Sequence, residues 1–597
     1  MTVRIANCSG FLGDRLAGPR EMVDGGAIDY LTGDWLAELT MSILTRQRDR
    51  DPGKGFPGTF IAQMSEVLAS CATRGIRIIA NAGGVNPHAC AAALQEVVDA
   101  HGLETVIAVV DGDDITEDFN RSIASGKWDG SHLTSGEPFS SLGETPTVVS
   151  AYLGAWGIVE ALDAGATLVV TGRVSDASPI VASAAHHYGW GRADLDRIAG
   201  AVAAGHVIEC SAQATGGNFS FFTEIDDLTH PGFPVAEIEE DGSAIITKHA
   251  ETGGAVTTET VLSQLLYEID GPRYANPDVI ARFDTVFVDQ VGEDRVRVSG
   301  AIGESVPSHL KAGAVCNIGW SAAMSVAVTG LNRDAKVDLL LSQVWSQFPK
   351  GRETFDDVVI TVTGGLNDAS RNPRSVDDAP ALLRIAVAGR DKPLVNRFPR
   401  VVVEQLLGGF PGMALPTPPT KAGLRQQFWP TLVPTEQVPE RVTIGDRQWF
   451  VNHVPVDGQV DLPLPEVGGG SNDVSEAEVA TLVVAPLGRI AGARSGDKGG
   501  NSTLGLWART DEAFDYLRQW WTAEHVAELL GATEDREFQL WAMPHLRSVG
   551  VTVVGWLGEG AASNLRIDPH GKGLGEYVRS RHIPVPEDLL SAADQSA

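Results

Sequence analysis

Cysteine is scarce in this chain. Five cysteines occur among the 597 residues, and no two of them are spaced as CxxC. So few and so widely separated thiols argue against a disulfide framework and against a structural zinc site. We therefore expect a protein of a reducing cytoplasm.

Basic residues are also in the minority. The chain has 46 Lys and Arg against 77 Asp and Glu, which leaves a formal net charge of −31. Nucleic-acid binding depends on clustered Lys and Arg that displace counterions from phosphates, so this balance argues against a nucleic-acid partner. An anionic ligand would need a local basic pocket.

Long apolar runs and several common catalytic signatures are missing. No stretch approaches 18 uninterrupted apolar residues, and the amino terminus lacks the pattern of an export signal, so we expect neither a membrane partner nor targeting. The Gly-x-Ser-x-Gly elbow, the Walker A loop and HExxH are absent. Their absence removes the common hydrolase, nucleoside-triphosphatase and zincin interpretations.

What is present first is an alternation of short β-branched runs with longer segments. The runs lie at residues 3–6, 76–80, 106–110 and 167–170, and apolar spacing predicts helices over 60–71, 88–100 and 148–162. This alternation indicates a parallel sheet covered on both faces. The predicted fold class is α/β, with a Rossmann-like parallel-sheet domain at the amino terminus.

The pattern changes further along the chain. Strand-like runs at 285–289, 295–299, 358–363 and 383–388, with helices near 321–329 and 337–348, indicate a second α/β or α+β lobe. Proline, three consecutive glycines and acids then indicate a linker, and the runs after it a small α+β domain. We predict domains at residues 1–284, 285–454 and 481–597, with the linker at 455–480.

Polar loops that contain glycine follow the four amino-terminal runs. Since ligands of open parallel sheets bind at the carboxyl ends of the strands, we expect the loops at 7–10, 81–84, 111–114 and 171–173 to form one site. The binding candidates of the first two loops are Cys8, Ser9, Gly10, Asn81, Gly83 and Gly84. The first loop is a GxGxxG pattern with Cys8 for its first glycine, but the acid expected at the end of a second strand is missing, so a turn or another anion is favoured over a dinucleotide.

Residues 111–118, DGDDITED, concentrate carboxylates after the third run. Four of them would share one face of a helix, an arrangement that suits Mg²⁺, the only cofactor for which we find a candidate. The alternative is an acidic helix start that complements the helix dipole. No complete set of metal ligands is evident, and Asp111 is in addition an acid–base candidate.

Two further motifs combine acid, base and cation. His206 and Glu209 are three residues apart, so they would meet on a helix but face opposite ways on a strand. They precede an amide- and glycine-rich segment that we expect to face a ligand through Gly216, Gly217 and Asn218. Arg173 would clamp an anion, and Asp176 would act as a base or orient another group. The alternative is that the two residues form only an ion pair and a helix cap.

Cys8 and Cys210 are candidate nucleophiles, with His88 and His206 as activating bases, although free cysteines are commonly small buried hydrophobes. Near the carboxyl terminus, residues 493–501 predict a basic glycine loop in which Arg494 and Lys498 bind an anion such as a phosphate. The alternative there is a plain hairpin turn with solvated charges.

Six long motifs occur in order along the chain: SGFLGDR (9–15), IANAGGVNP (79–87), AYLGAWGIVEALDAGA (151–166), TGRVSDAS (171–178), GHVIECSAQATGGNF (205–219) and LLYEIDGPRYANPDV (265–279). Together they resemble the AtuA family, which is named for acyclic terpene utilisation. ARSGDKGGNSTLG (493–505) and RIDPHGKGLG (566–575) resemble the small ferredoxin-fold domain that accompanies AtuA, fused here.

The resemblance implies a role in degrading citronellol- and geraniol-type compounds through CoA thioesters, alongside biotin-dependent acyl-CoA carboxylases. It transfers no catalytic residue. Our first hypothesis is a cytoplasmic homo-oligomeric lyase, a hydratase, dehydratase or carbon–carbon lyase, that acts on a branched acyl-CoA with Asp111, Asp176, His206 and Glu209 as acid–base candidates. The second is a non-catalytic partner or scaffold of a carboxylase. A third, a metal-dependent enzyme, depends on further ligands.

Overall fold

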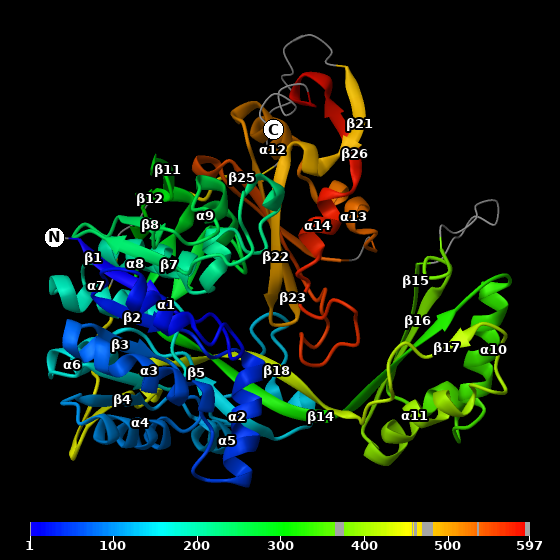
Figure 1. Cartoon of the computed structure of the whole chain (residues 1–597), viewed down its shortest axis with the longest axis horizontal. Coiled ribbons are helices and arrows are strands. Elements are labelled where there is room, and N and C mark those ends of the chain that lie inside the picture. The colour runs from blue at the N-terminus through cyan, green and yellow to red at the C-terminus, as the bar shows by residue number, and fades with distance from the viewer. Residues whose placement is uncertain are drawn as a thin grey trace.

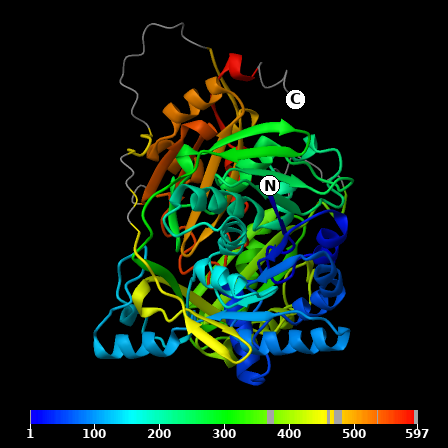
Figure 2. The same cartoon turned by 90° about the vertical axis from the view of Figure 1, so that its left-hand side faces the viewer.

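The computed structural model describes residues 2–364, 375–456, 458, 462–467, 481–533 and 536–590. Most of the predicted linker at 455–480 lies outside these residues. Figure 1 shows a large body that contains the amino terminus, a lobe that projects to one side, and a carboxyl-terminal domain, orange to red, above the body. The turned view keeps that domain at the top (Figure 2). Of the helices that the structure describes, none combines the length and the hydrophobicity that a bilayer crossing needs.

A mixed sheet organises the large body. Its centre is parallel and has the order β1 (Val3–Asn7), β2 (Tyr30–Gly33), β3 (Arg77–Ala80), β6 (Leu168–Thr171) and β4 (Ile107–Asp111). Antiparallel strands extend both edges: β7 (Pro234–Ile238), β8 (Ala244–Lys248), β12 (Arg295–Ser299) and β11 (Phe287–Gly292) beyond β1, and β19 (Arg441–Ile444) and β20 (Arg447–Phe450) beyond β4. The Rossmann-like prediction therefore holds for the centre, whereas the whole sheet is mixed.

Helices cover both faces of the parallel strands, as the alternating side chains require. In β3, Ile78 and Ala80 point into one apolar cluster and Ile79 into the other. The first face packs against α1 (Gly18–Gly25), α3 (Gly58–Arg74) and α4 (Pro87–His101). The second packs against α6 (Trp156–Asp163), α7 (Ser178–Tyr188) and α8 (Leu195–Ile208).

The predicted helix over 148–162 is partly wrong. Residues 146–151 form β5 (Pro146–Ala151), and the helix α6 begins only at Trp156. The apolar run of β5 pairs with β14 (His309–Val328) in a second sheet, and this long-range pairing overrides the local helical spacing. The helix predicted near 321–329 is wrong for the same reason, because these residues, up to Val328, lie within β14.

The projecting lobe is built on the second half of β14. There β14 pairs with β16 (Ala381–Gly389) and β17 (Met413–Ala414), and β15 (Asp357–Gly364) pairs with β16. One face packs on α10 (Arg333–Trp345) and α11 (Lys392–Glu404). The first half of β14 pairs with β5 and β18 (Gly423–Pro434) in the body. Since β11, β12, β19 and β20 join the main sheet, that sheet continues beyond the predicted boundary at residue 284.

Several shorter elements lie around the main sheet. The loop after β2 leads into α2 (Glu38–Arg50), and α5 (Thr116–Ser125) follows β4. The short helix η2 (Ser211–Thr215) and α9 (Thr258–Leu265) lie next to α8, and β9 (Arg273–Asn276), β10 (Val279–Arg282) and β13 (Ile302–Gly303) form a three-stranded sheet beside them.

The carboxyl-terminal domain has its own apolar core. Its antiparallel sheet has the order β22 (Ala491–Lys498), β23 (Asn501–Ala508), β25 (Ser548–Val553) and β24 (Phe538–Met543). Three helices and a two-stranded ribbon complete it: α12 (Asp511–Trp520), α13 (Ala523–Leu530) and α14 (Leu574–Arg579), with β21 (Leu482–Pro486) and β26 (His582–Pro586).

Candidate functional site

The four predicted loops meet at the carboxyl edge of the parallel strands. Gly83 N donates to Thr171 O at 3.0 Å, which joins the second loop to the fourth. The loop after β2 lies between the first two, because Asp34 N donates to Ser9 O at 2.9 Å and the Asn81 amide donates to the Asp34 carboxylate. This convergence confirms the prediction of a common edge and adds Asp34, which sequence reasoning missed.

Arg173 is held rigidly at the corner between β6 and α7. Its side chain is only 4% exposed, and its Nη1 donates to Asp176 Oδ1 at 2.6 Å. The guanidinium lies 4.2 Å from the centre of the Tyr152 ring. The ion pair that we considered as the alternative is thus present, and it lies among further charges.

Those charges come from α2 and β14. Lys311 Nζ is 3.8 Å from Glu38 Oε1 and 4.8 Å from the Tyr152 ring centre, and the Tyr152 hydroxyl donates to Glu38 at 3.3 Å. A cavity of ≈ 10 Å³, lined in part by Glu38, Tyr152, Arg173 and Phe428, lies between them. This volume is room for about one water molecule, so the site is closed.

His206 and Glu209 meet at the end of α8, as the helical alternative predicted. His206 Nδ1 and Glu209 Oε1 are 3.1 Å apart, and the imidazole packs against the rings of Tyr274 and Phe283. Within the described part of the chain, His206 Nε2 and Glu209 Oε2 are buried without a hydrogen-bond partner. Buried polar atoms of this kind are uncommon in folded proteins, so they mark this pair as a candidate functional group.

The environment shifts both pKa values towards the neutral forms. Burial, followed by the charges of Asp176 and Glu268, raises the pKa of Glu209 well above its usual range. Burial, followed by the charge of Lys498, lowers the pKa of His206 to about 4. At neutral pH the imidazole is therefore neutral, and burial favours the protonated form of the carboxyl group beside it.

The carboxyl-terminal domain completes the site through β22. Lys498 Nζ donates to Glu268 O at 2.8 Å, and Arg494 Nη1 donates to Asn218 O at 3.1 Å. The Arg494 guanidinium also stacks 4.3 Å from the centre of the Tyr267 ring. Figure 1 shows β22 and β23 reaching down from this domain towards β14 and β18.

The predicted basic loop at 493–501 is therefore wrong as a loop. Residues 491–498 pair along their whole length with β23, and only Gly499 and Gly500 form the turn. Arg494 is 6% exposed, so it is a buried group rather than a solvated charge.

We call the assembled groups the interdomain cluster, since their contacts and mutual charge effects join them across the two parts of the chain. Its members are Asp34, Glu38, Tyr152, Arg173, Asp176, His206, Glu209, Tyr267, Glu268, Lys311, Arg494 and Lys498.

Backbone strain gathers around the same cluster. Of the non-glycine residues with positive φ in the described ranges, Ser211, Asn218 and Glu268 lie here, with φ of 51°, 57° and 55°. Such conformations persist where the surrounding structure holds them, which is common at functional sites.

Cys8, Ser9 and Gly10 lie in the loop after β1, next to the candidate site. The Cys8 thiol is buried in an apolar cluster, and burial raises its pKa well above the usual range. Ser9 Oγ donates to Phe11 O at 3.2 Å, and Gly10 N donates to Asp14 Oδ2 at 2.8 Å. Their polar groups are engaged within the fold rather than directed at a ligand.

The glycine amides expected to bind a ligand are likewise engaged. Gly83 N and Gly84 N donate to Thr171 O and Asn81 O, and Gly216 N and Gly217 N donate to Gln213 O and Ala212 O. A Cβ on Gly83 would lie 2.4 Å from Thr171 O, so glycine is needed there for close packing. Asn81 acts through Asp34, and the side chain of Asn218 is exposed while its carbonyl holds Arg494.

Asp111 and the acidic stretch bind separate partners. Asp111 lies between His88 Nε2 at 2.6 Å and Arg441 Nε at 2.7 Å. Asp113 accepts from Arg173 N at 2.8 Å, and burial raises its pKa to about 7. Asp118 pairs with Arg121. Among the residues that the structure places, no three His, Cys, Asp or Glu side chains are grouped as metal ligands.

Two family models match the chain. The model described as acyclic terpene utilisation family protein AtuA matches residues 3–444. The chain belongs to the AtuA family. A second model, the AtuA ferredoxin-like domain, matches residues 485–584. No curated protein and no solved structure matches the chain. The interdomain cluster thus takes residues from both the AtuA region and the AtuA ferredoxin-like domain.

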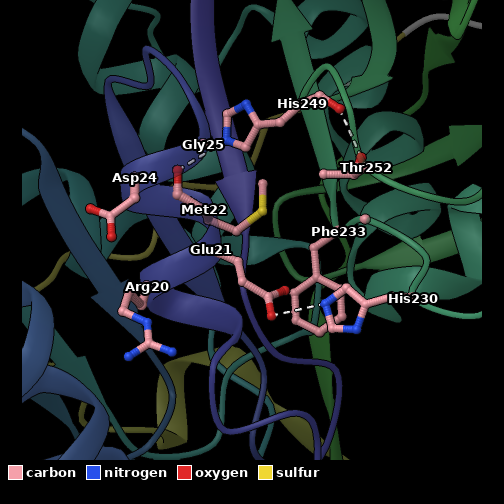
Figure 3. Close-up of a pocket in the computed structure, with 10 residues that line it drawn as sticks. Arg20, Glu21, Met22, Asp24, Gly25, His230, Phe233, His249 and Thr252 are labelled. Carbon is pink, nitrogen blue, oxygen red and sulfur yellow. Dashed lines mark hydrogen bonds and ion pairs between the residues drawn. The ribbon is translucent and has the colours of Figure 1, made fainter.

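The AtuA region also contains a larger cavity of ≈ 390 Å³, which lies between α1 and the segments that flank β7 and β8. Figure 3 shows Glu21 in contact with His230, and His249 beside Met22, among the residues that line this cavity. It contains no residue of the interdomain cluster. Burial lowers the pKa of His249 in this cavity, but the carboxyl groups with raised pKa, Asp34 and Glu209, and the buried Arg173 and Arg494 lie in the interdomain cluster. We therefore assign the candidate site to that cluster.

Proposed function

We propose that this AtuA protein is a cytoplasmic enzyme of acyl-CoA catabolism that acts on the CoA thioester of an acyclic terpenoid or branched-chain acid. Its reaction would be a hydration, a dehydration or a carbon–carbon cleavage next to the thioester. The observation that carries the proposal is the buried pair of His206 and Glu209, 3.1 Å apart, each with a polar atom that has no hydrogen-bond partner in the described structure. Asp176 and cations from both parts of the chain act on this pair.

This arrangement suits proton transfer beside a thioester carbonyl. In a hydration, a base removes a proton from water while the oxygen bonds to the β-carbon, and an acid delivers a proton to the α-carbon. We assign Glu209 as the acid, held by His206, and Asp176 as the base, held by Arg173. Lys498 is placed to stabilise negative charge that develops on the thioester oxygen.

Closure is part of the proposal. Because His206, Glu209 and Arg494 are buried where the two parts of the chain meet, substrate access would require the ferredoxin-like domain to move away from the sheet edge. Closing again excludes water and strengthens the electrostatic interactions inside the site.

The test is a panel of terpenoid and branched acyl-CoAs followed by mass spectrometry. We expect Glu209→Gln and Asp176→Asn to lower turnover by roughly 10² to 10⁴-fold, the usual contribution of an acid or base, with melting temperatures close to that of the wild type. Glu117→Gln, an exposed carboxyl on α5, is the matched control and should keep full activity.

Cys8→Ser should also keep most activity, because the thiol is buried in the core. Complete loss of turnover in this variant, with the fold intact, would contradict this assignment and indicate covalent catalysis by Cys8. Turnover of none of the thioesters by the wild type would favour the alternative, a non-catalytic partner of a biotin-dependent acyl-CoA carboxylase.

A further inference from the structure

Arg494 offers a hydrogen-bonding edge that nothing in the described structure uses. Its Nη1 donates to Asn218 O and its face covers the Tyr267 ring. Its Nε and Nη2 are buried and have no hydrogen-bond partner among the described residues. These two N–H groups lie along one edge of the guanidinium, the edge that pairs with the two oxygens of a carboxylate.

The charge of Arg494 is also uncompensated. Its side chain is 6% exposed, and no ion pair joins it to a carboxylate within the ranges that the structure covers. Arginine is seldom buried unless it is paired. An anion that arrives with the ligand would supply the missing partner.

Other polar atoms without partners lie on the neighbouring elements. Gln264 on α9 is 1% exposed, and neither atom of its amide group has a hydrogen-bond partner in the described structure. Gln213 Oε1 of η2 is also buried without a partner there. Because α9 packs against both η2 and β22, these amides lie on the elements that surround Arg494. They provide additional donors and acceptors for a polar group.

The position of Arg494 along β22 relates this edge to the acid–base groups. Residues 494, 496 and 498 point to the same face of the strand. Gly496 approaches Tyr267 and Glu268, and Lys498 acts on His206 and Glu209. Arg494 and Lys498 are four residues, or roughly 13 Å of strand, apart. Because both long side chains extend from the same face of the strand, a short acyl chain can lie between their cationic ends.

We propose that Arg494 binds a carboxylate on the acyl chain, so that the substrate is a thioester with a free carboxylate at the end remote from CoA. This inference rests on the proposed function for the thioester and on Arg494 for the carboxylate. One buried cation with two coplanar N–H groups neutralises a carboxylate, whereas a CoA phosphate would leave surplus negative charge buried. We therefore assign Arg494 to this carboxylate rather than to the phosphate expected from the sequence.

The experiment compares two isosteric thioesters with the full chain. Glutaryl-CoA ends in a carboxylate, and 5-methylhexanoyl-CoA has an isopropyl group in its place. By calorimetry we expect the wild type to bind glutaryl-CoA about 10 to 100-fold more tightly, the range of one or two charge-assisted hydrogen bonds. Arg494→Met should abolish or invert this preference. Arg536→Met, the same change elsewhere in the domain, should preserve it.

A second readout guards against misfolding of the variant. Glutarate alone should raise the melting temperature of the wild type but not that of Arg494→Met, or of Arg494→Gln if the methionine variant does not fold. Equal affinity of the wild type for both thioesters, or a preference that survives in Arg494→Met, would overturn the inference.

These outcomes separate this inference from the proposed function. Carboxylate-dependent binding without turnover would support the Arg494 site and contradict the proposed lyase activity. Turnover of uncharged thioesters without any carboxylate preference would do the reverse.

Discussion

At the scale of single residues, two carboxyl groups meet the start of α6. Glu440 Oε1 accepts from Gly157 N at 3.0 Å, and Asp278 Oδ2 accepts from Ala155 N at 2.8 Å. A helix start favours negative charge, but burial dominates here. Burial, followed by the charge of Asp278, raises the pKa of Glu440 to about 8.

This shift predicts a pH-dependent effect of Glu440→Gln. The folded-state pKa is raised, so the stability linked to it is fully present below the unfolded value of 4.5 and is lost as the pH rises towards 8. Glutamine keeps the acceptor for Gly157 N and cannot ionise. We expect the variant to be more stable than the wild type by about 1–3 kcal/mol at pH 8.5, and this advantage to shrink at pH 5.

Urea unfolding at the two pH values measures the difference. The new amide N–H faces His453 Nε2, which is 3.8 Å from Glu440 Oε2 and buried without a hydrogen-bond partner in the described structure. A stability difference that does not change with pH would contradict the assignment.

At the scale of elements, local sequence predicted the strands whose residues favour strand and missed those that depend on distant partners. The β-branched runs at β3, β4, β6 and β15 are strands in the structure. In contrast, SAAMSVAV in β14 contains good helix formers, and it is a strand because β16 pairs along all of it and β17 pairs with its end. ARSGDK in β22 is rich in loop residues, yet β23 pairs with all of it.

Local sequence also limits the prediction of site residues. Motifs indicated Arg173 with Asp176 and His206 with Glu209, because each pair lies within four residues of sequence. Glu38, Lys311 and Glu268 come from three unrelated segments, and only the fold brings them to the cluster. No local pattern contains that information.

Docking of the β22–β23 hairpin predicts a sensitive glycine. A Cβ on Gly496 would lie 2.5 Å from Glu268 Cγ and 2.9 Å from the Tyr267 ring. Gly496→Ala should therefore push the hairpin away from the AtuA region, lower stability by about 1–3 kcal/mol and reduce turnover more than tenfold. Thermal unfolding and initial rates measure the two effects.

Gly58→Ala is the control, because a Cβ there meets nothing within 4 Å. Unchanged rates in Gly496→Ala would show that the hairpin contact is not needed for the reaction.

At the scale of the whole molecule, the projecting lobe has a core of its own and also touches the carboxyl-terminal domain, where Ala386 and Ala388 pack with Leu565. Its core, which includes Val326, Leu340, Leu383 and Phe398, forms a cluster distinct from those of the main sheet. The lobe joins the body mainly through β14 and β18, whose last register pair is Ser321 and Gly423.

This geometry predicts that the lobe can be removed. Replacing residues 322–422 with Asn-Gly would close β14 and β18 as a two-residue hairpin. The deletion also removes the hydrogen bond that Arg384 Nη1 donates to Leu565 O of the carboxyl-terminal domain at 2.7 Å. We expect the shortened chain to keep its far-ultraviolet circular dichroism shape and to melt within about 5 °C of the main transition of the full chain.

Aggregation of the shortened chain, or loss of its cooperative transition, would show that the lobe belongs to the body's folding unit. Retained turnover would show that the lobe takes no part in the reaction.

The distribution of the interdomain cluster along the chain also determines when the protein becomes competent during synthesis. Glu209 and Arg494 are separated by 494 − 209 = 285 residues. At about 5–20 residues per second, roughly 15–60 s pass between their emergence from the ribosome. Until then the nascent AtuA region exposes its acid–base groups to water. A product that terminates before β22 would be folded in large part, and inert.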